Sequence, residues 1–322
     1  PGNPKWQMEA LYAKENIGIV FYSQRRFAEA ARELDAAIPT MERLAAKNPD
    51  NAQYQGELSL MLAWLADARR DDGQLQLAID ARSKQVELLG KLVSAGKKDV
   101  QLQEKLVFAQ QALGVLLADT GNFPPAVDTL RSAIADAETL VSIEPDNATW
   151  RGAAGGVHLE LAGILLALRH TSEAEREAEA GCEIAAMLRE RDPNVTTWRS
   201  FLTSCRLVRS KLALASGSAP DALAWAEKSL LSARSENTID PIRDRYRIAG
   251  TYRLIGEIHR RMGDPRLARA AWTAGLAQLP ANVNERPREM KERAELLSRL
   301  GRGEEARPLA ERLRAIGYRR AI

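Results

Sequence analysis

The sequence predicts an all-α protein built from stacked helical hairpins. Three observations support this class: equivalent residues recur every 48 positions, each repeat holds two apolar stripes at helical spacing, and no segment alternates long enough for a strand. With 45% apolar and 28% charged residues, the 322-residue chain has the composition of a folded protein with a large core. We therefore expect a repeat array rather than two or three separate globular domains.

The repeat is marked first by a large residue that follows a short loop. This series is Trp6, Tyr54, Leu102, Trp150, Trp198 and Tyr246. A second series of small residues marks the second helix of each unit: Ala30, Ala78, Ala126, Ala174, Ala222, Ala268 and Ala306. These series divide the chain into six hairpins over residues 1–284 and a shorter seventh over residues 285–322. Because the seventh is rich in Arg and Glu, we expect it to be a polar C-terminal cap.

Each unit is predicted to be two antiparallel helices joined by a tight turn. In the third unit a helix covers residues 104–118, and a second apolar stripe runs from Ala126 to Val141 until Pro145 ends it. Small residues such as Gly114 and Ala126 let the two helices approach closely. We expect left-handed glycines at the end of the first helices: Gly73, Gly121, Gly217, Gly263 and Gly301.

These spacings resemble the tetratricopeptide repeat family. The best match is carried in order by Tyr252, Ile255, Gly256, His259, Ala268, Trp272, Gly275 and Pro280. The units exceed the usual length of about 34 residues and are similar to the long-helix arrays of bacterial multidomain signalling proteins. The resemblance implies a right-handed α-solenoid of about seven hairpins, whose first helices line a concave groove that binds a protein or peptide. We therefore expect a protein-interaction scaffold within a larger bacterial signalling or regulatory protein.

Mapped through this resemblance, the groove surface changes from apolar to basic along the chain. The predicted binding residues are Tyr12, Tyr22, Trp64, Asp67, Arg70, Phe108, Gly156, Leu159, Gly163, Leu166, Leu207, Leu214, Arg253, Arg260 and Lys291. The same mapping places Leu60 and Lys211 on this surface. A partner with an apolar stretch and an acidic end would fit it. The clamp with which chaperone-tail relatives bind a terminal carboxylate is absent, because its positions carry Glu15, Ile19 and Trp64.

Charge is spread unevenly along the chain. Residues 1–240 hold 27 Lys and Arg against 33 Asp and Glu, a balance of −6, whereas residues 241–322 hold 19 against 10, a balance of +9. The basic end is either a surface for an acidic partner or a solvated face whose charges pair with one another, as residues 289–293 suggest. A nucleic-acid-binding regulator is a less favoured alternative, because aromatic residues do not interleave the arginines. A regulatory sensor module of an enzyme is a third alternative.

Two groups of residues raise a choice between packing and binding. Gly152, Gly155, Gly156 and Gly163 lie in one predicted helix, each at a cost of about 1 kcal/mol relative to alanine. They either let a ligand backbone approach or allow tight helix packing. The periodic aromatic residues are expected to pack between units. Two tryptophans stand outside that series and are expected to be more exposed: Trp64 and Trp225.

The sequence predicts no catalytic residue, cofactor or metal site, and so no enzyme. His158, His170 and His259 are isolated, without a Walker loop or a nucleophile elbow. Cys182 and Cys205 lie in successive predicted helices and are expected to be reduced, buried thiols. No apolar run reaches the length of a membrane span, and we expect a cytoplasmic protein without membrane contact. The first unit lacks a cap, so its apolar edge is expected to pair with upstream residues or with a second copy as a homodimer.

Overall fold

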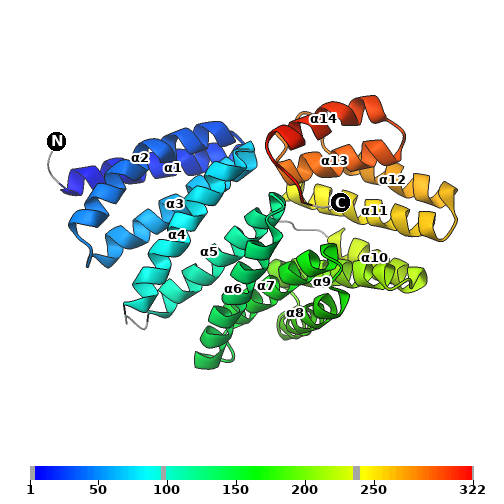
Figure 1. Ribbon diagram of the computed structural model, residues 1–322, viewed down its shortest axis with the longest axis horizontal. Coiled ribbons are helices and arrows are strands. Elements are labelled where there is room, and N and C mark those ends of the chain that lie inside the picture. The colour runs from blue at the N-terminus through cyan, green and yellow to red at the C-terminus, as the bar shows by residue number, and fades with distance from the viewer. Residues whose placement is uncertain (1–3, 96–98, 235–239, 321–322) are drawn as a thin grey trace.

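The computed structural model describes residues 4–95, 99–234 and 240–320, and this part of the chain folds into fourteen α-helices without a strand. Consecutive helices pair as antiparallel hairpins that stack side by side (Figure 1). The first four hairpins comprise α1 (Pro4–Ser23), α2 (Phe27–Lys47), α3 (Ala52–Asp72), α4 (Leu75–Ser94), α5 (Val100–Asp119), α6 (Phe123–Ile143), α7 (Ala148–Ala167) and α8 (Thr171–Arg191). The last three comprise α9 (Thr196–Ala215), α10 (Ala219–Ala233), α11 (Pro241–Arg261), α12 (Pro265–Gln278), α13 (Pro287–Arg299) and α14 (Gly303–Ala315). The predicted all-α hairpin array is confirmed.

Each hairpin reverses through a residue in the left-handed backbone region. The five predicted turn glycines have φ values between 78° and 90°: Gly73, Gly121, Gly217, Gly263 and Gly301. In the first and fourth hairpins, which lack a glycine at this point, Arg25 and Arg169 adopt φ values of 61° and 64°. The prediction for the turn glycines is confirmed, because this conformation satisfies the last carbonyl groups of the first helix.

Side-chain caps fix where several first helices begin. Asn51, Asp99, Asn147 and Asp240 each accept a hydrogen bond from a backbone N–H in the first turn of α3, α5, α7 and α11. Such an oxygen satisfies a donor that has no partner within the helix. The Asp and Asn residues of the loops between hairpins therefore set the register of the next unit.

Small residues allow the two helices of a hairpin to approach closely. Six alanines of the second-helix series are fully buried: Ala30, Ala78, Ala126, Ala174, Ala222 and Ala268. On the facing helix, a Cβ atom at Gly114 would lie 2.6 Å from Cγ of Leu130. That separation is well below the ~3.5–4.0 Å of a carbon–carbon contact. The close crossing expected from these residues is confirmed.

The periodic aromatic residues pack between units in the interior of the array but not at its start. Trp150 and Tyr246 are buried, whereas Trp6 is 74% exposed. Trp6 lies on α1, which no described hairpin covers on that side, so the expectation of burial is wrong for this residue.

The two tryptophans outside the periodic series are half-buried rather than exposed. Trp64 packs against Tyr22 in an edge-on arrangement, with ring centroids 5.5 Å apart. Trp225 is covered by Arg209 and Lys228, whose charged groups lie 5.1 and 4.8 Å from the ring centroid. Both are more exposed than Trp150 and Tyr246 but less exposed than Trp6, so the expectation of greater exposure holds only in part, and neighbouring side chains cover their faces.

Two of the glycines in α7 serve helix packing. A Cβ atom at Gly152 would lie 2.8 Å from Cζ3 of Trp198, and one at Gly155 would lie 2.5 Å from Cζ of Phe201. Both aromatic rings belong to α9, so the packing interpretation holds for these two positions. The rings of the fifth hairpin occupy the space that larger side chains on α7 would fill.

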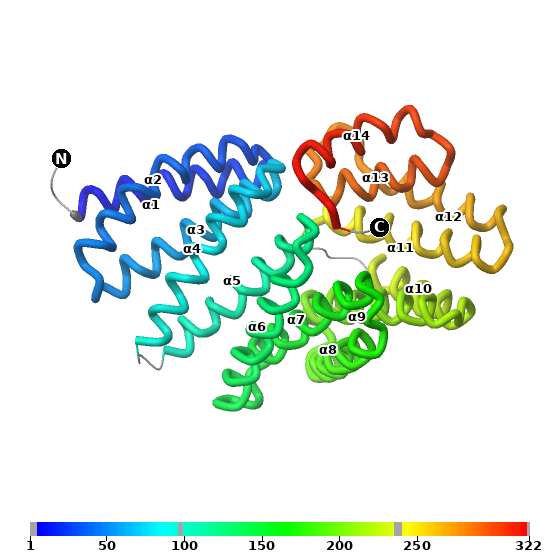
Figure 2. The backbone as a smooth tube through the Cα atoms, viewed as in Figure 1, coloured from blue at the N-terminus to red at the C-terminus, as the bar shows by residue number. Residues whose placement is uncertain are grey.

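The seventh hairpin folds back across the array. Helix α13 contacts α3 as well as its neighbours α11 and α12. Figure 2 shows the C-terminal part of the chain returning beside the ends of α3 and α5. Met290, Leu313 and Tyr318 are buried in one cluster with Leu75 and Leu116 of the second and third hairpins. The hairpin that we expected to cap the last unit therefore also closes the array onto its N-terminal half.

Polar contacts hold this closure at the turns of the first two hairpins. The side chain of Arg25 donates to the carbonyl of Asn284, and the side chain of Asn284 donates to the carbonyl of Arg25, both at 2.9 Å. Arg25 also forms an ion pair with Glu289. In the second hairpin, Oδ2 of Asp71 lies 2.9 Å from Nε of Arg286. Each turn thus has its own partner on the segment around the start of α13.

Asp119, at the end of α5, receives the largest set of closing contacts. Its carboxylate lies 3.0 Å from Nε of Arg288 and 3.2 Å from Nη1 of Arg320. Its backbone carbonyl accepts hydrogen bonds from the backbone N–H groups of Arg319 at 2.7 Å and Arg320 at 3.1 Å. Asp119 is 1% exposed. Asp71 and Asp119, at the ends of α3 and α5, therefore hold arginines of the C-terminal segment, whereas at the first hairpin Arg25 pairs with Glu289.

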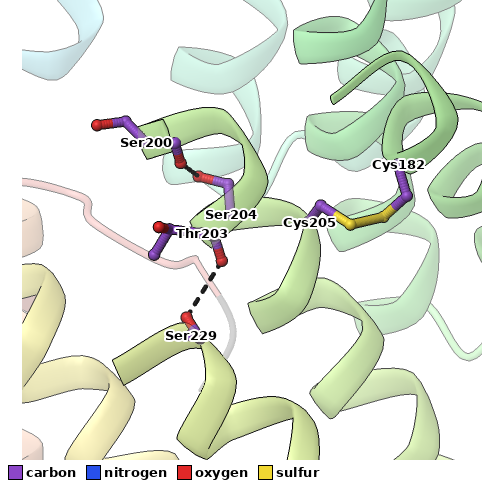
Figure 3. Close-up of a disulfide and its surroundings, with 6 residues drawn as sticks. All are labelled: Cys182, Ser200, Thr203, Ser204, Cys205 and Ser229. Carbon is purple, nitrogen blue, oxygen red and sulfur yellow. Dashed lines mark hydrogen bonds between the residues drawn. A yellow bond between two sulfur atoms is a disulfide. The ribbon is translucent and has the colours of Figure 1, made fainter. Parts of the chain in front are cut away.

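Cys182 of α8 and Cys205 of α9 form a disulfide (Figure 3), with their Cα atoms 5.2 Å apart. The expectation of reduced thiols is wrong, because the stacking of α9 on α8 brings the two side chains together. The next contact of α9 is with α10, where the hydroxyl of Ser229 donates to the carbonyl of Thr203 on α9 at 3.1 Å (Figure 3). The disulfide joins the fourth hairpin to the fifth covalently.

An apolar stripe on α1 is uncovered. Its members are exposed at helical spacing: Trp6, Ala10, Ala13, Ile17 and Val20. We expect the chain to self-associate through this stripe, and the double change Ile17→Glu and Val20→Glu to return it to the monomer. Sedimentation velocity over a range of concentrations measures this, with Leu231→Glu on α10 as an exposed apolar control. A strictly monomeric unchanged chain at high concentration would contradict the expectation.

Candidate functional site

The first helices of the hairpins form the inner side of the array. Five pairs of successive first helices contact each other, α1 with α3, α5 with α7, α7 with α9, α9 with α11 and α11 with α13, whereas second helices of the described hairpins make no comparable contacts. Residues spaced by four, three and four positions share one side of a helix. We call the following set the inner face: Leu60, Trp64, Asp67 and Asp71 on α3; Phe108, Ala112, Val115 and Asp119 on α5; Gly156, Glu160, Gly163 and Ala167 on α7; Ser204, Val208, Lys211 and Ala215 on α9.

Two apolar side chains of the inner face are exposed at equivalent positions of adjacent helices. Leu60 on α3 is 46% exposed, and Phe108 on α5 is 44% exposed. We call them the apolar pair. On α1, Tyr12 continues the row, but its hydroxyl donates to Glu57 at 3.1 Å and accepts from Gln53 at 3.1 Å. The apolar pair therefore offers uncovered apolar area beside a tyrosine whose polar end is already engaged.

Four predicted binding residues lie together but bond to one another. The hydroxyl of Tyr22 donates to Asp71 at 2.6 Å, and its ring packs on Trp64. Arg70 pairs with Asp67 at 2.8 Å and with Asp71 at 2.7 Å. Burial and the neighbouring carboxylate of Asp71 raise the pKa of Tyr22, which therefore stays a hydrogen-bond donor. These side chains form a structural network that reaches the C-terminal hairpin through Asp71.

The predicted leucines do not form an exposed apolar surface. Leu159 and Leu214 are buried, and Leu166 and Leu207 are half-buried in core clusters. Leu159 points toward α8, because a Cβ atom at Gly181 would lie 2.8 Å from its Cγ atom. The placement of Leu159 and Leu214 in a ligand groove is therefore wrong. Both fill space between helices.

The two remaining glycines of α7 differ in how open they are. At Gly156 a Cβ atom would lie 3.3 Å from Nε2 of Gln111, so this side chain covers the position. At Gly163 no described atom lies within 4 Å of a Cβ atom. Of the two glycines on the inner face, Gly163 is thus the one that leaves open space beside the backbone.

The predicted basic residues at the far end are already paired. Nε of Arg253 lies 2.6 Å from Glu292 and 2.9 Å from Glu295. Nζ of Lys291 lies 3.3 Å from Glu295, and Arg260 pairs with a glutamate one turn earlier on α11. The interpretation that the basic end pairs its own charges therefore holds for these three cations.

Lys211 of α9 is a cation of a different kind. It is exposed, and in the described parts of the chain it has no ion pair or hydrogen bond. Desolvation by the surrounding protein lowers the pKa of Lys211 to about 8, and the nearby charges of Arg253, Arg320 and Lys291 act in the same direction. The inner face thus presents an unpaired ammonium group among cations that carboxylates already hold.

Glu15 on α1 is expected to make the stability of the protein depend on pH. The side chain is buried, and its Oε1 atom has no hydrogen-bond partner among the residues that the structure describes. Burial together with Glu57 raises its pKa to about 7. Because the folded state holds this proton more tightly than the unfolded state does, stability from Glu15 is present below pH 4.5 and is lost as the pH rises to about 7. We expect Glu15→Gln to raise the free energy of unfolding by about 2 kcal/mol at pH 8 and by little at pH 4.5.

Urea unfolding of the parent and the variant at the two pH values measures this difference. The exposed Glu9 on the same helix provides the control, because Glu9→Gln should change stability equally little at both pH values. A gain from Glu15→Gln that is the same at pH 4.5 and pH 8 would show that charge burial is not its cause.

The geometry described above is that of an α-helical solenoid, a fold that this chain shares with solved structures. A Rap protein complexed with competence and sporulation factor is 17% identical, with a TM-score of 0.58 over 95% of this chain and 74% of that chain. BtubC from P. vanneervenii is 17% identical, with a TM-score of 0.52 over 78% of this chain and 90% of that chain. The apo form of RapI is 12% identical, with a TM-score of 0.51 over 95% and 76%. The likeness is one of fold.

At the level of sequence, no family model and no curated protein matches the chain. In the described residues, no helix has the length and apolar character that crossing a membrane requires. The same residues contain no group of three or more His, Cys, Asp or Glu side chains arranged to hold a metal ion.

Proposed function

We propose that this chain is a scaffold that binds an extended segment of another protein along the inner face. The observation that carries the proposal is the apolar pair, Leu60 and Phe108, exposed at equivalent positions of adjacent first helices. Side chains of a bound segment that cover this pair would remove its exposed apolar surface from water. Such burial is favourable by about 25 cal/mol per Å² of apolar surface. A curved row of helices also offers a long surface, which suits an extended ligand.

Two further points support this function. The Rap protein, whose fold this chain shares, has been solved in complex with competence and sporulation factor. The inner face also combines an apolar part on α3 and α5 with an unpaired cation on α9, which fits a partner with an apolar stretch and an acidic end. A place in a larger bacterial signalling or regulatory protein is part of this proposal, since the resemblance in sequence implies it.

A random peptide library selected against the immobilised chain tests the proposal. We expect peptides with large apolar residues to be enriched, and the double change Leu60→Ser and Phe108→Ser to weaken their binding by about tenfold or more. Leu77→Ser on α4 is the matched control, because Leu77 is also 46% exposed but lies on a second helix. Fluorescence anisotropy gives the affinities, and circular dichroism melting shows whether the variants fold.

Two results would overturn the proposal. One is a selection that enriches no peptide against the folded chain. The other is an equal loss of affinity from Leu77→Ser, which would move binding away from the inner face.

Nucleic-acid binding by the basic C-terminal third is less well supported. Besides Arg253, Arg260 and Lys291, many cations of this region lie in ion pairs: Arg261, Arg286, Arg288, Arg293, Arg299, Arg302, Arg307 and Arg320. A phosphate backbone would have to displace these carboxylates, which also repel it. Retention on duplex DNA that falls steeply with salt would favour this alternative.

A further inference from the structure

Lys211 stands where three other cations converge, from three different parts of the chain. Arg253 belongs to α11, Lys291 to α13 and Arg320 to the C-terminal segment, and the charge of each acts on Lys211. Their own partners hold these three cations: Glu292 and Glu295 for Arg253, Glu295 for Lys291, and Glu160 and Asp119 for Arg320. Glu292 attracts Lys211 from a distance, but the repulsion from the three cations acts against this, and Lys211 has no ion pair or hydrogen bond of its own in the described residues.

The surface next to Lys211 is open. Gly163 of α7 occupies the position of the inner face that Lys211 occupies on α9, and these two helices contact each other. No described atom lies within 4 Å of the place where a Cβ atom of Gly163 would stand. Among the described residues outside its own turn of helix, no side chain therefore blocks the approach of a ligand backbone to α7 here, and the adjacent helix carries the exposed residue Lys211.

We propose that Lys211 and the open surface at Gly163 form a subsite for one acidic side chain, Asp or Glu, of the bound segment. This inference rests on the proposed function and adds a direction to it. The apolar part of the segment would lie on α3 and α5, and its acidic residue on α9. One carboxylate would supply the counter-charge that Lys211 lacks and would offset the repulsion from the three neighbouring cations.

The surrounding charges favour a single carboxylate over a polyanion. Five charged groups from neighbouring elements interact electrostatically with Lys211: Glu160, Arg253, Lys291, Glu292 and Arg320. Three of them are cations, but each already has at least one carboxylate within 3.3 Å. One carboxylate can reach Lys211 between these pairs. A run of phosphates would also meet Glu160 and Glu292, at a repulsive cost.

The protonation of Lys211 gives this subsite a pH dependence with a fixed sign. In the free protein its pKa is about 8, so the ammonium form predominates at pH 7. A bound carboxylate favours the charged form and raises the pKa. Binding of an acidic side chain is therefore expected to be strongest between about pH 5 and pH 7, where both groups are charged, and to weaken as the pH rises through 8 toward the raised value.

The first experiment uses the full chain with ¹³C-dimethylated lysines and two small probes. N-acetyl-glutamate-N-methylamide carries one carboxylate, and N-acetyl-glutamine-N-methylamide is its neutral match. Lys211→Gln assigns the NMR signal. We expect a saturable shift of this signal, and a raised pKa, with the glutamate probe only, while exposed Lys47 on α2 stays unchanged. An unsaturable shift, or equal shifts at Lys211 and Lys47, would overturn the subsite.

The second experiment separates this inference from the function on which it rests. A library-selected peptide with an acidic residue is compared with its Glu→Gln form on the parent chain and on Lys211→Met. We expect Lys211→Met to weaken the acidic peptide by about fivefold at low salt and the neutral form by little. If both forms bind the variant as they bind the parent, the subsite is wrong and the scaffold stands.

Two other outcomes would contradict either the scaffold or the acidic side chain as ligand. If no peptide binds but the glutamate probe still saturates at Lys211, the scaffold is wrong and the subsite stands. If a 20-nucleotide single-stranded DNA binds more tightly than any peptide and loses this binding in Lys211→Met, the ligand is a nucleic acid and the proposal of an acidic side chain is wrong.

Discussion

Replacing Asp119 by alanine is expected to release the C-terminal hairpin from the first three hairpins and to lower the free energy of unfolding by about 3 kcal/mol. The carboxylate is buried and holds Arg288 at 3.0 Å and Arg320 at 3.2 Å. Removing it leaves two guanidinium groups close together without their common counter-charge. The partial exposure of both arginines keeps the expected loss near the lower end for a buried pair.

Two measurements report this release separately. Urea unfolding gives the stability, and small-angle X-ray scattering gives the radius of gyration, which should rise as α13 and α14 leave α3 and α5. Asp128→Ala on α6 is the control, because Asp128 is exposed and should lose less than about 0.5 kcal/mol. An Asp119→Ala variant with unchanged stability and an unchanged scattering profile would show that the apolar contacts of Met290, Leu313 and Tyr318 suffice for closure.

Replacing Gly256 by alanine is expected to cost about 2 kcal/mol, although alanine is the better helix former by about 1 kcal/mol. The added Cβ atom would overlap with Nε1 of Trp272, whose ring is buried in the sixth hairpin. To make room, the indole must move and give up its hydrogen bond to the carbonyl of Arg253, now 3.2 Å long. The steric cost and the lost hydrogen bond together exceed the gain in helix propensity.

The matched control is Gly90→Ala in α4, where no atom of the described residues outside its own turn of helix lies within 4 Å of the added Cβ. This variant is expected to be more stable than the parent by about 0.5–1 kcal/mol, so the same substitution has opposite signs at the two positions. Thermal and urea unfolding followed by circular dichroism measure both. A stabilised Gly256→Ala variant would mean that the two helices of the sixth hairpin can separate at little cost.

The repeat itself could be read from the sequence because its causes are local. Turn glycines, second-helix alanines and capping residues each act within one hairpin, so their spacing identifies them. The exposed pair Leu60 and Phe108 could also be predicted from this register, since a 48-residue step leads from one first helix to the equivalent position of the next.

The features that the sequence did not predict depend on contacts between distant units. Asp119 meets Arg288 across 169 residues, and no periodic signal relates the two positions. The groove mapping predicts Arg253 as a binding residue, and spacing cannot identify its partner Glu292, which lies 39 residues away on another helix. The prediction that Leu159 lies in the groove is wrong for a related reason. Its side of α7 faces α8, and the crossing of the two helices decides between groove and core.

Closure of the array changes how this protein can deform. A solenoid with two free ends behaves like a spring, whose pitch and width vary as each joint between units flexes. Here the turn of the first hairpin is bound to the segment before α13 by hydrogen bonds that span 259 residues. Flexing at one joint must then be compensated at the others, so the curvature of the inner face is set collectively. A ligand would meet a surface whose shape is already fixed, and binding would cost less conformational entropy than on an open array.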